Sequence, residues 1–327
     1  MNKKQKLVFI SWGKYNSRTE SLANALLAEA VFLGKKHSNK FIFYSAIRYV
    51  WYAYQNIKIL LKLKPNIVII EDTTWVIALV NFLYAKISKT KLVLDSHSCA
   101  FDHIFVKYPL FISKFFAKYS TLSFVTNQSH YDLLKEKNAN ALILSDIPFE
   151  NNFTHKNKIV LSKKFNVFYI CTFSGDEPYM EVIKAAYELK DVQIFITGNF
   201  ASANINPDNY KHIKFTGYTG NEEYRKLISS ADAIITLTNR EDTMQRAGSE
   251  AVSAGKPLIT SNTKMLRSYF ERGTLFVDNT AKGIAEGINK LKNNYDFYSS
   301  EIILFRENRK KIFANKLNEI HKYLGLK

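Results

Sequence analysis

The sequence predicts an α/β protein made of two Rossmann-like domains, each built on a parallel β-sheet. Short apolar, β-rich runs alternate with helical patterns through both halves of the chain. The length of 327 residues is too great for one typical domain and suits two domains of about 150 residues each. Residues 215–262 hold three apolar runs separated by two helical segments. This strand–helix–strand–helix–strand order is typical of a parallel sheet.

The chain divides into four segments. We expect an N-terminal domain over residues 1–147, a linker over 148–163, a C-terminal domain over 164–304 and a final segment over 305–327. The linker is polar, contains a proline and lacks periodicity. The final segment is basic and amphipathic, which predicts a helix.

Six strands and five helices are expected in residues 1–147. The first helix, 20–33, has apolar residues at helical spacing, a cap at Ser17 or Thr19 and a stop at Gly34. Two runs are continuously apolar and β-rich, which is typical of strands buried on both faces. The strands are 6–11, 41–44, 66–70, 91–95, 121–126 and 141–144, and the helices are 20–33, 47–63, 76–87, 101–119 and 129–137.

The C-terminal domain repeats the alternation of strands and helices. Its helix 246–254 directly follows the loop 240–245 and is stopped by Gly255. Loops after the carboxyl ends of parallel strands are where such sheets bind ligands. The strands are 166–173, 192–197, one ending at Gly217, 233–237, 257–260 and 273–277, and the helices are 179–189, 222–230, 246–254 and 281–291.

The loop 240–245 has the features of an anion site. Backbone N–H groups at a helix start point outward, and the helix dipole adds about half a positive charge there. A phosphate is therefore the expected ligand. Asp242 and Glu250 lie eight residues apart across this helix start. Carboxylates accept strong hydrogen bonds from sugar and ribose hydroxyls, so the pair suits a sugar-bearing phosphate.

This arrangement resembles the donor signature of family-4 (group 1) glycosyltransferases with the GT-B fold, of the bacterial polysaccharide-biosynthesis kind. The family pattern is Glu-x7-Glu, and here it is Asp242-x7-Glu250. The surrounding sequence is also similar to that of the family: FTGY at 215–218, SADA at 230–233 and GKPLI at 255–259. The resemblance implies two Rossmann-like domains facing across a cleft, with the final helix packing back on the N-terminal domain.

The function implied by the resemblance is retaining transfer of a sugar from a nucleotide-diphosphate sugar to a saccharide, as in lipid-linked or cell-surface glycans. The enzyme would be of the hexosyltransferase type, with no cofactor and no metal. The chain also lacks an Asp-x-Asp sequence that would hold a divalent ion on a diphosphate. Two alternatives remain: a GT-B nucleotide-sugar epimerase, and a non-catalytic GT-B partner subunit.

The resemblance also implies roles for individual residues. His97 and Asp242 are the expected catalytic residues and would hold sugar hydroxyls, while Glu250 would bind ribose and Tyr218 would lie near the base or donor. His97 follows the carboxyl end of a strand, and Asp95 could orient its ring; a histidine buried in the domain core is the alternative. The expected donor-binding residues are Ser174, Gly175, Tyr218, Asp242, Thr243, Met244, Gln245, Arg246 and Glu250.

The loop after the first strand of each domain departs from a phosphate-binding pattern. The loop 12–18 has one glycine and not G-x-G-x-x-G, which disfavours a dinucleotide cofactor. The loop 174–178 is acidic and lacks the Arg and Lys-Gly of many family members. Donor phosphates would therefore depend on the helix start with Arg240, Arg246 or Lys264. In GT-B enzymes the first loop faces the acceptor, and its acceptor-side candidates are Gly13, Lys14, Asn16, Ser17 and Arg18.

The net charge is +17, and residues 1–160 carry +12 of it, from 22 Lys/Arg against 10 Asp/Glu. Nucleic acid is disfavoured as a partner, because zinc-ligand spacing and RNP-type motifs are missing and Lys far outnumbers Arg. The aromatic, Lys-bearing segments 47–64 and 101–119 suit either helices packed on the sheet or elements lying on an anionic membrane. Compositional bias is the alternative source of the charge.

The expected location is cytoplasmic, with peripheral association at the inner face of the cytoplasmic membrane. No apolar stretch reaches the roughly 20 residues that span a bilayer, and the N-terminus lacks a signal-peptide pattern. The two cysteines, Cys99 and Cys171, adjoin apolar runs in different halves. Their number suits buried thiols in a reducing compartment and not a disulfide framework.

Overall fold

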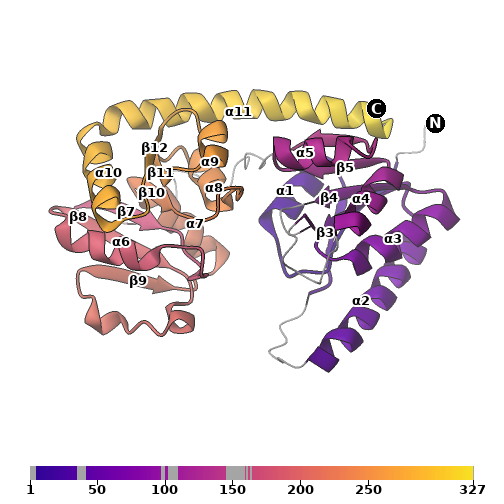
Figure 1. Cartoon of the computed structure of the whole chain (residues 1–327), viewed down its shortest axis with the longest axis horizontal. Helices are drawn as coiled ribbons and strands as arrows, with labels where there is room; N and C mark the ends of the chain where they lie inside the picture. The colour runs from indigo at the N-terminus through magenta and orange to yellow at the C-terminus, as the bar shows by residue number, and fades with distance from the viewer. Residues whose placement is uncertain are drawn as a thin grey trace. The chain divides into compact units, whose positions relative to one another are not determined.

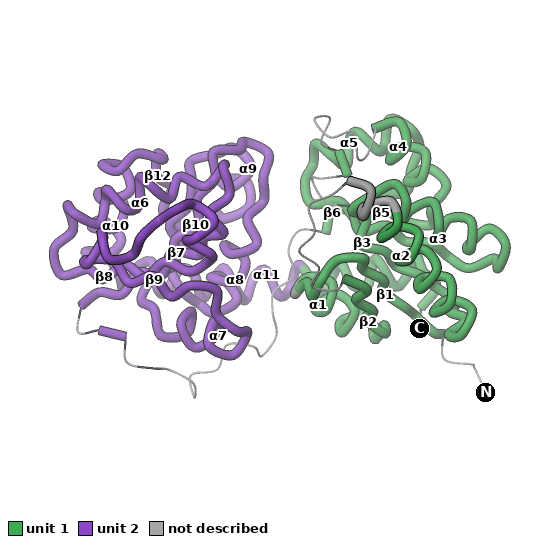
Figure 2. Tube along the Cα trace, turned by 90° about the horizontal axis from the view of Figure 1, so that it is seen from below, with its two compact units in different colours: residues 1–147, 313–327 green, residues 148–312 purple. Residues whose placement is uncertain are grey.

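The computed structural model describes residues 5–34, 42–96, 100–101, 110–144, 159, 161–162 and 164–326. The chain forms two compact units, shown in different colours in Figure 2. Unit 1 comprises Met1–Ile147 with Phe313–Lys327, and unit 2 comprises Pro148–Ile312. Each unit contains one six-stranded parallel sheet with helices on both faces, which confirms the predicted α/β class (Figure 1).

Unit 1 has the strand order β2-β1-β3-β4-β5-β6. The apolar runs of β1 and β3 are buried along their whole length, as expected for central strands of a parallel sheet. The strands are β1 (Leu7–Ser11), β2 (Glu29–Phe32), β3 (Ile67–Asp72), β4 (Lys91–Ser96), β5 (Leu122–Val125) and β6 (Ala141–Ile143). The helices lying wholly in this unit are α1 (Ser17–Ala25), α2 (Ile42–Leu63), α3 (Trp75–Ser88), α4 (Leu110–Tyr119) and α5 (Gln128–Lys135).

Two predictions for this unit are wrong. The helix expected over 20–33 ends at Ala25, and the chain continues into β2, which pairs in parallel with β1. A Cβ at Gly34 would lie 2.3 Å from the carbonyl carbon of Gly13, so this glycine permits a close approach of two loops and does not end a helix. A strand is expected over 41–44, but residues 42–44 are the start of α2, and β2 already occupies this edge of the sheet.

Unit 2 has the strand order β12-β11-β10-β7-β8-β9, again all parallel. The strands are β7 (Phe165–Tyr169), β8 (Val192–Thr197), β9 (Ile213–Gly217), β10 (Ala233–Thr236), β11 (Leu258–Ser261) and β12 (Thr274–Val277). The helices lying wholly in this unit are α6 (Tyr179–Ala185), α7 (Asn221–Ser230), α8 (Arg246–Ala254), α9 (Lys264–Tyr269) and α10 (Ala281–Asn293).

The final helix, α11 (Tyr295–Leu324), begins ten residues before the predicted start at 305. It contributes to the cores of both units. Ile302 and Phe305 are buried in a cluster of unit 2, whereas Ile320 and Leu324 are buried in unit 1 beside the side chains of β1. None of the helices in the described ranges is both long and apolar enough to cross a membrane.

Candidate functional site

The candidate site lies at the carboxyl edge of the unit 2 sheet. From β7, the first strand of this unit, β8 and β9 extend the sheet to one side, whereas β10, β11 and β12 extend it to the other. The direction in which successive strands are added to the sheet therefore reverses at the boundary between β7 and β10. In open parallel sheets, ligands bind in the crevice at such a switch point.

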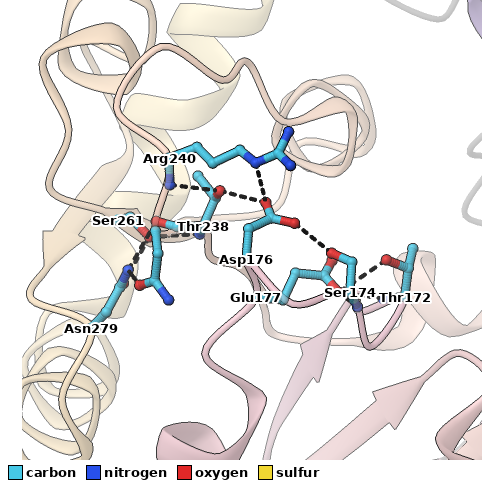
Figure 3. Close-up of polar contacts among 9 residues, drawn as sticks. Thr172, Ser174, Asp176, Glu177, Thr238, Arg240, Ser261 and Asn279 are labelled. Atoms are coloured by element: carbon cyan, nitrogen blue, oxygen red, sulfur yellow. Dashed lines mark hydrogen bonds and ion pairs between the residues drawn. The ribbon is translucent and has the colours of Figure 1, made fainter. Parts of the chain in front are cut away.

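The loops after β7 and β10 are joined by the carboxylate of Asp176 (Figure 3). Its Oδ1 accepts a hydrogen bond from the Ser174 hydroxyl at 2.6 Å, and its Oδ2 accepts one from the Thr238 hydroxyl at 2.8 Å. Arg240 Nε lies 3.9 Å from the same Oδ2. The backbone N–H of Asn239 also donates to the Asp176 carbonyl, at 2.7 Å. These contacts hold both flanks of the switch point together.

The network lowers the pKa of Asp176 below its ordinary value. Partial burial raises the pKa, but the hydrogen bonds from Ser174 and Thr238 and the charge of Arg240 lower it further. A carboxyl whose pKa falls on folding stabilises the folded state above its unfolded pKa of about 3.9 and loses that contribution at lower pH.

Asp176→Asn is therefore expected to lower the unfolding free energy by about 0.5–1.5 kcal/mol at pH 7, the scale of a lost hydrogen bond. The difference in unfolding free energy between wild type and variant should become smaller as the pH falls below about 4, because only the wild type then loses the charge of residue 176. Thermal melts from pH 7 downward measure both effects. Asp208→Asn, at an exposed site in the loop before β9, is the matched control. A gap that does not depend on pH would contradict this assignment.

A second carboxylate fills the backbone concavity after β7. Glu177 Oε2 accepts hydrogen bonds from the backbone N–H and the hydroxyl of Thr172, both at 2.9 Å, and from the backbone N–H of Ser174 at 3.0 Å. N–H groups that converge in this way elsewhere hold phosphate. Here Glu177, one of the acidic residues noted in the sequence of this loop, occupies these N–H groups with its own carboxylate.

Ser174 and Gly175, two predicted donor-binding residues, lie in this loop. The backbone N–H of Ser174 donates to Glu177 and its hydroxyl donates to Asp176, both within the loop. A Cβ at Gly175 would meet nothing within 4 Å, so this glycine borders open space. The thiol of Cys171, at the start of the loop, is buried, is not in a disulfide and donates a hydrogen bond to Glu177 Oε2 at 3.5 Å. Its burial, followed by the charge of Glu177, raises its pKa.

The loop after β10 is also held by the last residue of β11 and by the loop after β12 (Figure 3). The Ser261 hydroxyl accepts from the Thr238 N–H at 2.9 Å and donates to Asn279 Oδ1 at 2.7 Å. Asn279 Nδ2 donates to the Thr238 carbonyl at 2.9 Å and to Asn239 Oδ1 at 2.7 Å. These side chains and Asp176 are not among the residues predicted from the sequence. The available signal was a polar residue at or just after the end of neighbouring strands.

The helix α8 begins at Arg246, with Gln245 as its N-cap, and ends at Gly255 in the left-handed conformation (φ 65°). The predicted junction of loop and helix is therefore confirmed. The side chain of Gln245 makes no capping hydrogen bond. Among the described residues, the buried Gln245 Oε1 and the hydroxyl of Ser249, which is 3% exposed, find no hydrogen-bond partner. The start of α8 therefore retains an amide oxygen and a hydroxyl that are available for hydrogen bonds, as well as the positive end of the helix dipole.

Glu250 lies in the second turn of α8 and is buried. Its Oε2 accepts a hydrogen bond from the Tyr224 hydroxyl of α7, and its Oε1 lies 3.9 Å from Arg246 Nε. Burial, followed by the Glu250 charge, raises the pKa of Tyr224 well above its ordinary value, so this hydroxyl stays a donor.

The remaining donor-side candidates differ in exposure. Asp242 is exposed in the loop four residues before α8, and Tyr218 is 90% exposed after β9. Thr243 and Met244 are half-buried, and Met244 packs against an apolar cluster of unit 2. The loop before α8 thus carries the predicted residues in both exposed and packed positions.

The acceptor-side candidates of unit 1 follow β1. Asn16 Nδ2 donates to Glu71 Oε1 at 2.7 Å, and the Ser11 hydroxyl donates to Glu71 Oε2. The N–H of Gly13 donates to the Ser11 hydroxyl at 3.0 Å. Lys14 is exposed, and Ser17 is the first residue of α1. The buried Glu71, which the sequence analysis missed, therefore holds this loop on the end of β3.

Arg18 differs from the other candidates because its side chain is buried. It is 2% exposed and binds both oxygens of Asp95, at 3.1 and 2.9 Å, and the carbonyl of Leu144 at 2.9 Å. Both oxygens of Asp95, the residue predicted to orient His97, accept hydrogen bonds from Arg18. His97 lies outside the described residues.

Comparisons of structure assign the chain to the GT-B fold class. Its fold is similar to that of the Anabaena protein HepE in complex with UDP-glucose, with a TM-score of 0.71 and 13% identity over 96% of this chain and 100% of that chain. It is similar to sucrose-phosphate synthase from Thermosynechococcus elongatus, with a TM-score of 0.74 and 12% identity over 98% and 99%. UDP-GlcNAc 2-epimerase from Methanocaldococcus jannaschii is also similar, with a TM-score of 0.56 and 16% identity over 87% and 92%.

Part of the sequence matches a family model. Residues 151–303 match the family model described as glycosyl transferases group 1. The matched range contains the loops after β7 and β10 and the whole of α8. A search of curated proteins finds no match.

Proposed function

We propose that the protein is a family-4 type, retaining glycosyltransferase of the hexosyl type, independent of metal and cofactor. Its donor would be a nucleotide-diphosphate sugar, and its acceptor a saccharide such as a lipid-linked or cell-surface glycan of bacterial polysaccharide synthesis. The observation that carries the proposal is the start of α8, at the carboxyl edge of the sheet. The unpartnered Ser249 hydroxyl and the buried Glu250 lie there, within the range matched by the group 1 model.

The start of α8 suits the leaving group of this reaction. The bond between the anomeric carbon and the β-phosphate oxygen breaks, and the same carbon forms a bond to the acceptor oxygen. Negative charge grows on the departing diphosphate, where the helix dipole and Arg246 would stabilise it. The acceptor proton passes to that diphosphate, so the mechanism needs no separate protein base.

The two carboxylates would act on hydroxyl groups. Glu250, held by Tyr224, would accept hydrogen bonds from ribose, and the exposed Asp242 would hold the transferred sugar with His97. The loop after β7 would contribute little to phosphate binding, because Glu177 already occupies its N–H groups. The roles of His97, of Tyr218 and of the acceptor-side loop stay predictions.

A nucleotide-sugar epimerase is the second candidate, since an epimerase shares the fold at a lower TM-score. The third is a non-catalytic partner subunit, which the carboxylate-filled loop after β7 would suit. The proposed location is cytoplasmic and peripheral to the inner face of the cytoplasmic membrane.

Incubation with a panel of UDP-, GDP- and dTDP-sugars distinguishes the three candidates. We expect one donor to raise the melting temperature, because a ligand at 100 times its Kd adds about 2.7 kcal/mol of stability. We also expect slow hydrolysis of that donor, detected by NMR. Isomerisation without hydrolysis would identify the epimerase. The absence of both binding and turnover across the whole panel would contradict the proposed transfer and favour the non-catalytic partner subunit.

A further inference from the structure

We propose that unit 1 docks on an anionic lipid surface through the outer sides of α2, α3 and α4. These three helices cover one face of the sheet, and residues from all three enter the same buried cluster. The helix α3 contacts both α2 and α4, and the three lie together in Figure 1. The proposal stands apart from the transfer chemistry, which uses other residues.

The outer sides of these helices carry many exposed apolar side chains. On α2, Tyr52 and Leu60 point into the core, while Val50, 71% exposed, and Tyr54, 61% exposed, lie outside. A helix that is apolar on both sides is typical of a second apolar environment beyond the core. We define the α2–α4 face by the eleven large hydrophobic residues that are exposed among the described side chains of the three helices: Ile47, Val50, Trp51, Tyr54, Leu61, Trp75, Leu83, Ile87, Phe111, Phe115 and Tyr119.

The charge on the same helices has one sign. Their 46 residues include no Asp or Glu. The nearby Glu136, just after α5, pairs with Lys114 at 3.2 Å. By contrast, α10 and α11 mix acidic and basic residues. The basic residues of the three helices are Arg48, Lys58, Lys62, Lys86, Lys114 and Lys118.

Two of these cations lie beside aromatic rings of α3 and α4. Lys86 Nζ is 5.4 Å from the ring centre of Phe82 and 5.7 Å from that of Tyr119, and Lys118 Nζ is 5.7 Å from Tyr119. Aromatic rings and long basic side chains are the residues that prefer the interface between lipid headgroups and acyl chains.

The combination selects a bilayer over other partners. Nucleic acid would account for the cations but not for Ile87, which is 86% exposed, or Phe111, which is 73% exposed. A second copy of the chain would account for the apolar side chains, but like charges on two identical faces would repel each other. An anionic bilayer accounts for both the cations and the exposed apolar side chains. Each Lys or Arg near its surface strengthens binding about fivefold.

Tryptophan fluorescence measures docking directly. The chain has three tryptophans; Trp12 is buried, whereas Trp51 and Trp75 lie on the α2–α4 face. With vesicles of phosphatidylglycerol and phosphatidylcholine at about 0.05 M salt, we expect a blue shift and co-sedimentation. About 1 M salt should reverse the initial attraction, because the screening length falls to about 3 Å. Pure phosphatidylcholine vesicles should bind at least tenfold more weakly.

Variants locate the docking surface. Ile87→Ser with Phe111→Ser should abolish the blue shift, and Lys58→Glu with Lys62→Glu should weaken binding at least tenfold. Tyr187→Ser with Phe297→Ser, at exposed sites of unit 2, should leave binding unchanged, as should Lys211→Glu with Lys282→Glu. Circular dichroism checks that each variant is folded. If the apolar variant is unfolded, vesicle binding by the Lys58→Glu/Lys62→Glu variant tests the proposal instead.

Three results would overturn the proposal. The first is equal binding to both vesicle types, and the second is no binding at low salt. The third is a dimer, seen by light scattering, that the Ile87→Ser/Phe111→Ser variant dissociates while vesicle binding is absent. That result would assign the face to a second copy of the chain.

Discussion

Glu250→Gln is expected to weaken binding of the nucleotide-sugar donor by about 1.5–3 kcal/mol, which is the scale of a hydrogen bond to a charged group. This corresponds to an increase in Kd of roughly 10- to 150-fold. The glutamine keeps an oxygen that can accept from the Tyr224 hydroxyl. The folded state should therefore change little, while the ribose hydroxyls lose their charged acceptor. Isothermal titration with the donor found in the panel measures the loss.

Three companion variants separate binding from folding. Tyr224→Phe removes the donor that holds Glu250 and should show a smaller loss of affinity. Glu223→Gln, an exposed change on the same helix α7, should leave affinity unchanged. Asp242→Asn should slow turnover with little effect on affinity, because Asp242 is proposed to contact the sugar. Unchanged affinity and turnover in both Glu250→Gln and Asp242→Asn would contradict the proposed donor site.

The second large effect concerns stability. Arg18→Met is expected to lower the unfolding free energy of unit 1 by about 3–5 kcal/mol, because it leaves the Asp95 carboxylate buried without its cation. The melting temperature of a unit of this size should fall by roughly 6–20 °C. A double variant, Arg18→Met/Asp95→Leu, should recover much of the loss, since apolar residues often replace a buried ion pair at little cost.

Melting curves distinguish a structural Arg18 from an acceptor-binding one. Lys14→Met, at an exposed position of the same loop, is the control and should leave the melting temperature unchanged. A normal melting temperature for Arg18→Met together with lost transfer to acceptor would assign Arg18 to the acceptor and reject the structural role.

Strands that are apolar throughout could be predicted from the sequence, because burial on both faces leaves an uninterrupted signal, as in β1 and β3. The edge strand β2 could not, since its residues are only partly buried and its apolar spacing also fits a helix. The start of α2 has the sequence pattern of a strand because aromatic and β-branched residues open it. Pairing of β2 with β1 decides between these possibilities, and such pairing is a long-range contact.

At the candidate site, the local motif could be predicted and the network could not. The junction of loop and helix at Gln245 and Arg246 follows from residues adjacent in sequence. The contacts of Asp176 with Thr238 and of Ser261 with Asn279 join residues 62 and 18 positions apart. The strand order brings these pairs together. The burial of Arg18 likewise depends on Asp95, 77 residues later in the chain.

The position of α11 in the chain affects how the protein folds during synthesis. Ile320 and Leu324 cover the face of unit 1 formed by β1 and α1, but the 165 residues of Pro148–Ile312 are translated before the segment that carries them. At about 5–20 residues per second, that interval is roughly 8–33 seconds. For this time the nascent unit 1 presents an incompletely covered apolar surface outside the ribosome, where chaperones bind such surfaces.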